Sequence, residues 1–296
     1  MSLQNKYSTF HSNISLNYYS SEYKEAKNKD ELILSKIKEE FKDRYTILRT
    51  PQLGSMKANT AIRPLNGGDY DIDRGIVLDN DSAPENPVIV KKQIKEVLSK
   101  HGFKEPKIKK PCVTADYKSK PIHIDYVVFT DDFTKQTKLG VGKEFSGESE
   151  RFWDYNDTEG LLEWLVWKGE FKSDDYKKQY YRIVRYLKRW RDYNYKVESE
   201  RKKVFSIALA VMAREQFQSD IDVNSGACDD HNCLINTLKS MLGDYKYFKP
   251  QGEGKYNIDV NLPKVPHIES PRVCQRLNNL RNWNNEKIKS LYIRIS

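Results

Sequence analysis

The chain has 296 residues, 38% of them hydrophobic and 31% charged, with a formal net charge of +9. This length suits one large domain or two packed lobes, and it can bury a substantial core. The sequence contains no run of 18 apolar residues, and its first residues lack the charged start and apolar core of a secretory signal. We therefore expect a cytoplasmic protein without membrane contact, and the positive charge favours an anionic partner such as nucleotides or nucleic acid.

The first half of the chain predicts a lobe that mixes helices and strands. The predicted elements are, in chain order, a helix at 21–44, a short strand or loop at 45–53, a helical or turn segment at 56–62, a strand at 70–79, a helix at 85–103, and strands at 112–117, 120–129 and 136–142. Periodicity places Leu32, Ile33, Ile37 and Phe41 on one face of the first helix. In the second helix it turns Ile89, Ile94, Val97 and Leu98 inward, and Gly102 is the expected stop.

The second half of the chain is predominantly helical. Its pattern predicts helices at 158–171, 174–194, 203–217, 233–242 and 270–291. We therefore expect an α+β protein with a core lobe at 1–157, which includes the N-terminal helix, and a helical lobe at 158–296. A groove between two such lobes is a common ligand site.

The four cysteines are too few and too scattered for a disulfide scaffold. Cys228, His231 and Cys233 could supply three zinc ligands, but their spacing is not that of a familiar tetrahedral site. The alternative is a helix start capped by Asp229 or Asp230, after which Leu234, Leu238 and Leu242 continue one apolar face. The sequence favours the helix start.

Three carboxylates interrupt predicted strands. Asp71 and Asp73 share one face of the strand at 70–79, because successive side chains of a strand alternate. Asp125 lies within an otherwise apolar strand and points the same way as His123. A carboxylate in the middle of a strand is costly unless it is paired or bound to metal. If the two strands were neighbours, their carboxylates would meet and could hold magnesium with substrate phosphates. The alternative is two turn residues beside Gly67 and Gly68, and a salt bridge at Asp125.

The segment before these strands favours the metal site. Gly54 and Ser55 form a turn at a helix start, where backbone N–H groups and a hydroxyl suit a triphosphate. A Gly-Ser turn, a short helix, a strand with Asp-x-Asp and a second strand with one Asp resemble the polymerase β-like nucleotidyltransferase fold.

The motifs of residues 54–78 are also similar to those of the cGAS/DncV-like nucleotidyltransferases, the bacterial second-messenger synthases of anti-phage CBASS systems. In that family a Gly-Ser is followed by Thr-Ala-Ile-Arg, here 60–63, and then by an Asp-x-Asp pair with a glycine and an apolar residue after it. We match these to Asp71, Asp73, Gly75 and Ile76, with Asp69 left in the turn. Segments at 181–194, 203–215, 229–242 and 257–273 resemble later family motifs, so the likeness covers nearly the whole chain. It carries no zinc insertion of the kind found in the animal cyclic GMP-AMP synthase.

The resemblance implies roles for seven residues. Asp71, Asp73 and Asp125 are the implied catalytic and metal-binding residues for two Mg²⁺ ions, which Mn²⁺ can replace. Gly54, Ser55, Lys188 and Ser206 are the implied nucleotide-binding residues. The implied reaction joins NTPs, with ATP and GTP expected, into a cyclic di- or trinucleotide and releases pyrophosphate.

Several partners follow from the same resemblance. It implies a monomer, a regulatory protein or RNA activator, and a downstream effector that senses the product. The alternatives are a related transferase that makes linear oligonucleotides or modifies RNA or protein, and a non-catalytic nucleic-acid-binding protein. The three carboxylates argue against the last, because without metal they would repel phosphate.

Overall fold

The structure is a computed structural model that describes residues 2–65, 67–131, 137–201, 204–252, 255–258 and 260–263. The helix predicted at 270–291 lies outside these residues. The elements of the first half are α1 (Leu3–Ile14), α2 (Ser21–Phe41), β1 (Ile47–Arg49), α3 (Gly54–Lys57), β2 (Tyr70–Asp79), α4 (Pro87–Lys100), β3 (Phe103–Ile108), β4 (Cys112–Tyr117), β5 (Ile122–Asp131), β6 (Lys138–Val141), a 3₁₀ turn (Glu148–Glu150) and β7 (Phe152–Tyr155). Those of the second half are α5 (Thr158–Leu165), α6 (Asp174–Asn194), α7 (Glu198–Arg201), α8 (Ser206–Glu215), α9 (Asp230–Gly243), β8 (Phe248–Gly252) and β9 (Lys255–Ile258).

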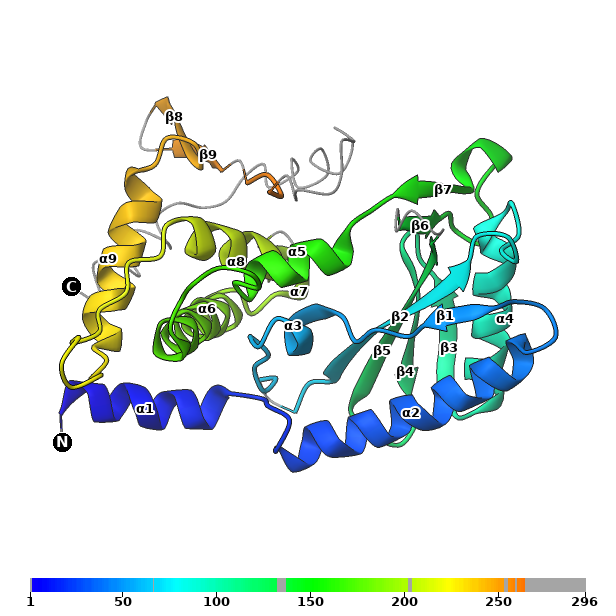
Figure 1. The fold of residues 1–296 in the computed structure, drawn as a ribbon, viewed down its shortest axis with the longest axis horizontal. Helices are drawn as coiled ribbons and strands as arrows, with labels where there is room; N and C mark the ends of the chain where they lie inside the picture. The colour runs from blue at the N-terminus through cyan, green and yellow to red at the C-terminus, as the bar shows by residue number, and fades with distance from the viewer. Residues whose placement is uncertain are drawn as a thin grey trace.

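The core lobe is built on a mixed sheet with the strand order β1-β2-β5-β4-β3, extended from β5 by β6 and β7. The central strands β2 and β5 are parallel, and the other pairs in this sheet are antiparallel. Helices α2 and α4 lie along one face of the sheet (Figure 1). This architecture confirms the predicted α+β class, with a mixed-sheet lobe followed by a helical region.

The alternation of side chains along β2 gives the sheet one face that packs against helices and one face that carries acidic residues. Ile72, Ile76 and Leu78 point toward α2 and α4 and are almost fully buried there. On that same face the guanidinium of Arg74 binds the carboxylate of Asp30 in α2. The opposite face carries the intervening acidic residues, so the carboxylates stand away from the covering helices.

The helical lobe packs around α6, whose buried stripe contains Tyr180, Ile183, Val184 and Leu187 as the 3.6-residue period predicts. Helix α8 is buried along nearly its whole length, also as predicted. The core of this lobe continues into the sheet through Val77 of β2 and Phe129. One apolar cluster therefore joins the helical lobe to one face of the sheet, and a second cluster lies between the opposite face and helices α2 and α4.

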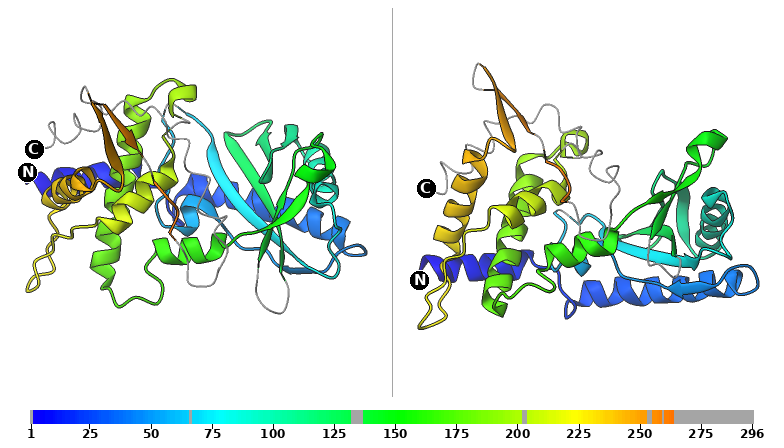
Figure 2. Two further views of the ribbon diagram at one scale, coloured as in Figure 1. Left: turned by 90° about the horizontal axis from the view of Figure 1, so that it is seen from above. Right: turned by 45° about the horizontal axis from the view of Figure 1, so that its top comes forward.

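Helix α1 was not predicted from the sequence. It contacts α6 and α9, and Figures 1 and 2 show it beside the helical lobe while α2 runs along the sheet. Its N-cap is Ser2, whose hydroxyl accepts from the backbone N–H of Asn5. The boundary between the lobes at residue 157 remains a prediction. Residues 3–14, which that prediction assigns to the core lobe, pack against the helical lobe.

Other local predictions were wrong. Ile89 and Leu32 are exposed, because the inward stripes run through Val90, Ile94 and Val97 in α4 and through Ile33 and Ile37 in α2. Strands β3 and β7 were missed, and α5 ends at Leu165, short of the predicted 171.

The segment around Cys228 is the start of α9. Asp229 caps the helix, its Oδ1 accepting from the backbone N–H of Asn232 at 2.9 Å. Cys233 is fully buried in the core of the helical lobe. In the part of the chain that the structure describes, no three His, Cys, Asp or Glu side chains form a group that could by itself hold a metal ion. The capping of α9 by Asp229 confirms the helix-start interpretation. Within the same residues, no helix is long and apolar enough to traverse a bilayer.

Candidate active site

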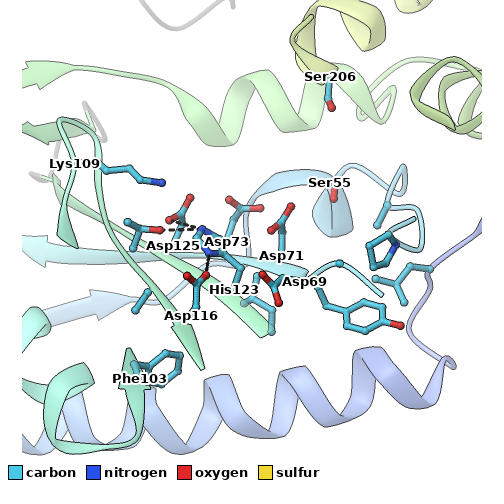
Figure 3. Close-up of a pocket in the computed structure, with 18 of the residues that line it drawn as sticks. Ser55, Asp69, Asp71, Asp73, Phe103, Lys109, Asp116, His123, Asp125 and Ser206 are labelled. Atoms are coloured by element: carbon cyan, nitrogen blue, oxygen red, sulfur yellow. Dashed lines mark hydrogen bonds and ion pairs between the residues drawn. The ribbon is translucent and has the colours of Figure 1, made fainter. Parts of the chain in front are cut away.

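The parallel pairing of β2 with β5 brings the predicted acidic residues together. In this register Asp71 lies beside His123, and Asp73 lies beside Asp125. All four side chains stand on the sheet face opposite α2 and α4, and Figure 3 shows them gathered in one cavity. The prediction that the two strands are neighbours is therefore confirmed. Asp69 comes just before β2, outside the strand, and lines the same cavity.

Desolvation makes these carboxylates electrostatically costly, although Asp71 is exposed and Asp73 and Asp125 are half-buried. Desolvation, and then repulsion by Asp125 and Asp71, raises the pKa of Asp73 to about 7. Desolvation likewise raises the pKa of Asp71, with Asp125 and Asp69 adding to the effect. Desolvation is also the largest influence on Asp125, but interactions with His123 and Thr114 outweigh it and lower the pKa of that carboxyl. Asp125 therefore remains ionised while its neighbours favour a proton or a bound cation.

The positive charge among these acids is His123. Its Nδ1 lies 2.6 Å from Asp116 Oδ1 and its Nε2 lies 2.9 Å from Thr114 Oγ1. Nε2 is also 3.5 Å from Asp125 Oδ1. The interaction with Asp125 and the bond to Asp116 raise the pKa of His123 to about 9, against the opposing effect of burial. The imidazole is therefore a cation at neutral pH.

Sequence reasoning noted the direction of His123 but missed its partners on β4. A signal was present, because Thr114 and Asp116 are two residues apart and so share one face of their strand. The antiparallel register then sets Asp116 beside His123 and Thr114 beside Asp125. The sequence alone does not show that β4 is the strand that pairs with β5.

The Gly-Ser turn packs directly on the second carboxylate of β2. Gly54 has a φ of +62°, and a Cβ placed on it would lie only 1.9 Å from Asp73 Oδ2. The backbone N–H of Leu53 donates to the carbonyl of Asp73 at 2.9 Å. Glycine at this position therefore lets the turn approach the carboxylate, and it leaves Ser55 on the cavity wall.

The helical lobe contributes the facing wall. Lys188 of α6 is 5% exposed, and its Nζ donates to both the carbonyl and the hydroxyl of Thr60 at 3.0 Å. Burial, and then the charges of Arg191 and Arg185, lower the pKa of Lys188 to about 7. Arg191 also donates to the hydroxyl of Ser206 at the start of α8. Lys188 and Ser206, the phosphate ligands implied by the family resemblance, thus both line the cavity.

The cavity between these walls has a volume of about 1540 Å³. Besides the acidic face, it is lined by cations that the sequence did not single out. They are Lys104 and Lys107 of β3, Lys109 after it, Lys118 after β4, Arg191 of α6 and Arg201 of α7. Six basic groups around an acidic floor suit a ligand that carries phosphates together with divalent cations.

The chemistry of the acidic face fits magnesium. Carboxylate oxygens are the ligands this ion prefers, and Asp125 Oδ1 is buried while accepting no hydrogen bond from the described residues. Asp71, Asp73 and Asp125 do not by themselves enclose a metal ion, as stated above. Magnesium is usually held by one or two carboxylates together with substrate phosphates and water, so an open acidic face is the expected form of such a site.

The part of the chain that carries this site is similar to a known family. Residues 50–129 match the family Cyclic GMP-AMP synthase DncV-like, nucleotidyltransferase domain. This segment contains α3, β2 and most of β5, and so all three aspartates. The match agrees, over residues 50–129, with the family that the sequence motifs indicated. No curated protein matches the chain significantly.

Solved structures share the fold over most of the chain. Escherichia coli DncV in its 3′-deoxy GTP bound form is 15% identical, with a TM-score of 0.57 over 83% of this chain and 63% of that one. Vibrio cholerae DncV cyclic AMP-GMP synthase, in complex with the linear intermediate pppA(3′,5′)pG, is 19% identical, with a TM-score of 0.54 over 83% and 62%. The chain thus spans less than two thirds of the length of these proteins, and at these identities the likeness establishes the fold.

Proposed function

We propose that this chain, whose core lobe is a cGAS/DncV-like nucleotidyltransferase domain, joins NTPs into a cyclic di- or trinucleotide and releases pyrophosphate. The observation that carries the proposal is the cavity between the lobes. One wall presents Asp71, Asp73 and Asp125, and the facing wall presents Lys188 and Ser206. A nucleotidyl transfer needs both, an acidic face for the cations and a basic face for the phosphates they carry.

The size of the cavity supports a reaction between two nucleotides. Sites for a single small ligand usually enclose about 300–1,000 Å³, whereas this cavity measures about 1540 Å³. A donor and an acceptor nucleotide can therefore be held together, as cyclisation requires. Vibrio cholerae DncV in complex with pppA(3′,5′)pG is a fold relative with a linear intermediate bound, which supports ATP and GTP as the substrates here.

The residues would divide the reaction as follows. An acceptor ribose hydroxyl attacks the α-phosphorus of the donor. The new O–P bond forms as the bond from the α-phosphorus to the bridging oxygen breaks, and pyrophosphate leaves. Asp125, ionised at neutral pH, accepts the proton of the hydroxyl. Ser55, Lys188 and Ser206 bind the β- and γ-phosphates and neutralise the leaving group.

Asp71 and Asp73 would hold the two Mg²⁺ ions, with Asp125 contributing to one of them. When bound, magnesium increases the acidity of the attacking hydroxyl and neutralises the phosphate charge. His123 keeps Asp125 ionised and aligned, because its imidazole contacts Asp116 on β4 through Nδ1 and faces Asp125 on β5 through Nε2. Gly54 allows the phosphate-binding turn to lie against Asp73.

The biological setting is part of the same proposal. The family resemblance supports an anti-phage second messenger made by a cytoplasmic monomer, a downstream effector that senses the product, and a protein or RNA regulator. The basic residues around the cavity offer an anionic regulator a surface.

The test is product analysis with a matched variant. The protein is incubated with all four NTPs and Mg²⁺, and the mixture is then treated with phosphatase. A phosphatase-resistant product that the Asp71→Asn/Asp73→Asn variant does not make supports cyclisation. A ladder of phosphatase-sensitive products would instead support a linear oligonucleotide synthase or tailing enzyme. No consumption of NTPs by the parental protein would contradict both.

A further inference from the structure

Thr60 links the two lobes at the edge of the active-site cavity. It lies between α3 and β2 and is 2% exposed, although it has a polar side chain. Both of its oxygens accept from the same atom, Lys188 Nζ of α6, at 3.0 Å each. The two residues are 128 positions apart in the chain, so this contact depends on how the lobes are joined.

The contact leaves Lys188 with a defined spare donor. An ammonium group carries three N–H donors, and Thr60 takes two of them. Among the described residues, Lys188 Nζ donates to no other hydrogen-bond acceptor. Lys188 lines the cavity together with Ser55 and Ser206. The remaining N–H is therefore the one available to a ligand in the cavity.

Fixing this side chain matters because lysine is long and flexible. A free lysine loses more rotamer entropy on immobilisation than most other side chains do. Anchoring the ammonium before a ligand arrives removes that cost from binding, which is the physical basis of pre-organisation. A hydroxyl and a carbonyl that converge on one nitrogen fix its position better than a carbonyl alone.

Neighbouring contacts show which part of this interface reaches the cavity. Arg185 Nε donates to the carbonyl of Ala61 at 3.1 Å, and Arg189 Nη2 donates to the carbonyl of Arg63 at 2.5 Å. Helix α6 therefore holds residues 60–63 by three cationic side chains. Of these three, Lys188 lines the cavity, whereas Arg185 and Arg189 do not. All three contacts join α6 to residues 60–63, and the Lys188 contact also sets the position of a side chain that lines the cavity.

We propose that Thr60 is a positioning residue, whose hydroxyl and carbonyl aim the ammonium of Lys188 at the phosphates of the donor nucleotide. The inference rests on the proposed function and extends it to a residue that does not itself touch substrate. It also gives the Thr-Ala-Ile-Arg stretch a physical task. Its threonine joins the lobes and sets the phosphate site in the same contact.

The test compares three variants in the full chain. Thr60→Val keeps the size of the side chain and removes the hydroxyl, Thr60→Ser restores the hydroxyl, and Arg189→Met removes a neighbouring contact between the lobes. The readouts are the Kd of tripolyphosphate with Mg²⁺, measured by calorimetry, the KM and kcat for NTPs, and the melting temperature. Tripolyphosphate reports the phosphate site alone, without the base or the chemical step.

We expect Thr60→Val to weaken tripolyphosphate binding about tenfold, equivalent to about 1.4 kcal/mol, which is close to the lower end of the range for a hydrogen bond to a charged group. The KM for NTPs should rise by a similar factor, with kcat within about twofold. Thr60→Ser should bind within about twofold of the parental protein. Arg189→Met should lower the melting temperature and leave tripolyphosphate binding within about twofold.

Three results would overturn the inference. Thr60→Val could bind tripolyphosphate as tightly as the parental protein, Arg189→Met could weaken binding as much as Thr60→Val, or the parental protein could fail to bind tripolyphosphate. The second result would assign the effect to lobe alignment alone. Failure of the proposed function can be told apart from failure of this inference. A parental protein that binds tripolyphosphate but does not consume NTPs contradicts the proposed reaction, yet the Kd values of the variants can still be compared.

Discussion

Replacing Gly54 by alanine tests whether the Gly-Ser turn positions the catalytic carboxylate. Gly54 has a φ of +62°, a left-handed conformation that costs an L-residue about 1–2 kcal/mol. The added Cβ would also stand 1.9 Å from Asp73 Oδ2 and 2.5 Å from its Cγ. Two costs therefore act together, one in the backbone and one at the active site.

The magnitude follows from how far Asp73 must move. Separations under 3.0 Å are essentially never seen for a Cβ, so the carboxylate oxygen has to retreat by about 1 Å. Asp73 is half-buried beside the turn, so the movement changes its position relative to Asp71 and Asp125. A displacement of about 1 Å can cost about 10²-fold in rate. We expect Gly54→Ala to lose about 10²-fold in kcat/KM.

Gly67 offers a matched control. Its φ is +70°, and a Cβ placed on it would meet nothing within 4 Å. Gly67→Ala therefore carries the same backbone penalty without the collision. NTP consumption and thermal unfolding are measured for both variants. Both should lose about 1–2 kcal/mol of unfolding free energy from the backbone term, but Gly67→Ala should keep its activity. Parental turnover in Gly54→Ala, or an equal loss of activity in Gly67→Ala, would refute the reasoning.

Three further predictions concern charge and metal. Asp71→Asn/Asp73→Asn should abolish NTP consumption and keep the fold, checked by circular dichroism; parental turnover would refute the site assignment. EDTA should stop the reaction and Mg²⁺ or Mn²⁺ restore it, and Mg²⁺ should raise the melting temperature of the parental protein but not of the double variant. Burial lowers the pKa of Lys91 to about 8 from a usual 10.5, so the unfolded chain binds more protons between these values and stability rises with pH there. Urea titrations at pH 8.0 and 9.5 should show the parental protein gaining about 2 kcal/mol relative to Lys91→Met, and equal changes in the two proteins would contradict this.

Much of the active site could be predicted because it depends on local periodicity. The two-residue repeat of a strand puts Asp71 and Asp73 on one face, whatever the rest of the chain does. An acid isolated in an otherwise apolar strand then indicated Asp125 as their partner, and the register of β2 with β5 agrees. The stripe of α6 and the capping of α9 by Asp229 were predictable for the same reason.

The predictions failed where an apolar helix stripe was taken one residue too wide, or where a segment had a weak hydrophobic pattern. Leu32 and Ile89 sit at the borders of their apolar stripes, and only packing against the sheet decides which border faces solvent. Strand β3 alternates charged and apolar residues around Pro106, which hides it among loop signals. Helix α1 has a mean hydropathy near neutral, and its place depends on α6 and α9.

The sequence by itself determined the type of most helices and strands, the shared face of Asp71 and Asp73, and the glycine that the turn requires. The tertiary structure alone decided which distant groups meet. It placed His123 between Asp116 and Asp125, Lys188 on Thr60, and α1 on the helical lobe. The physical reason is that covalent geometry fixes how side chains alternate along one element. Contacts between elements form only when long-range packing offsets the entropy of closing the chain between them.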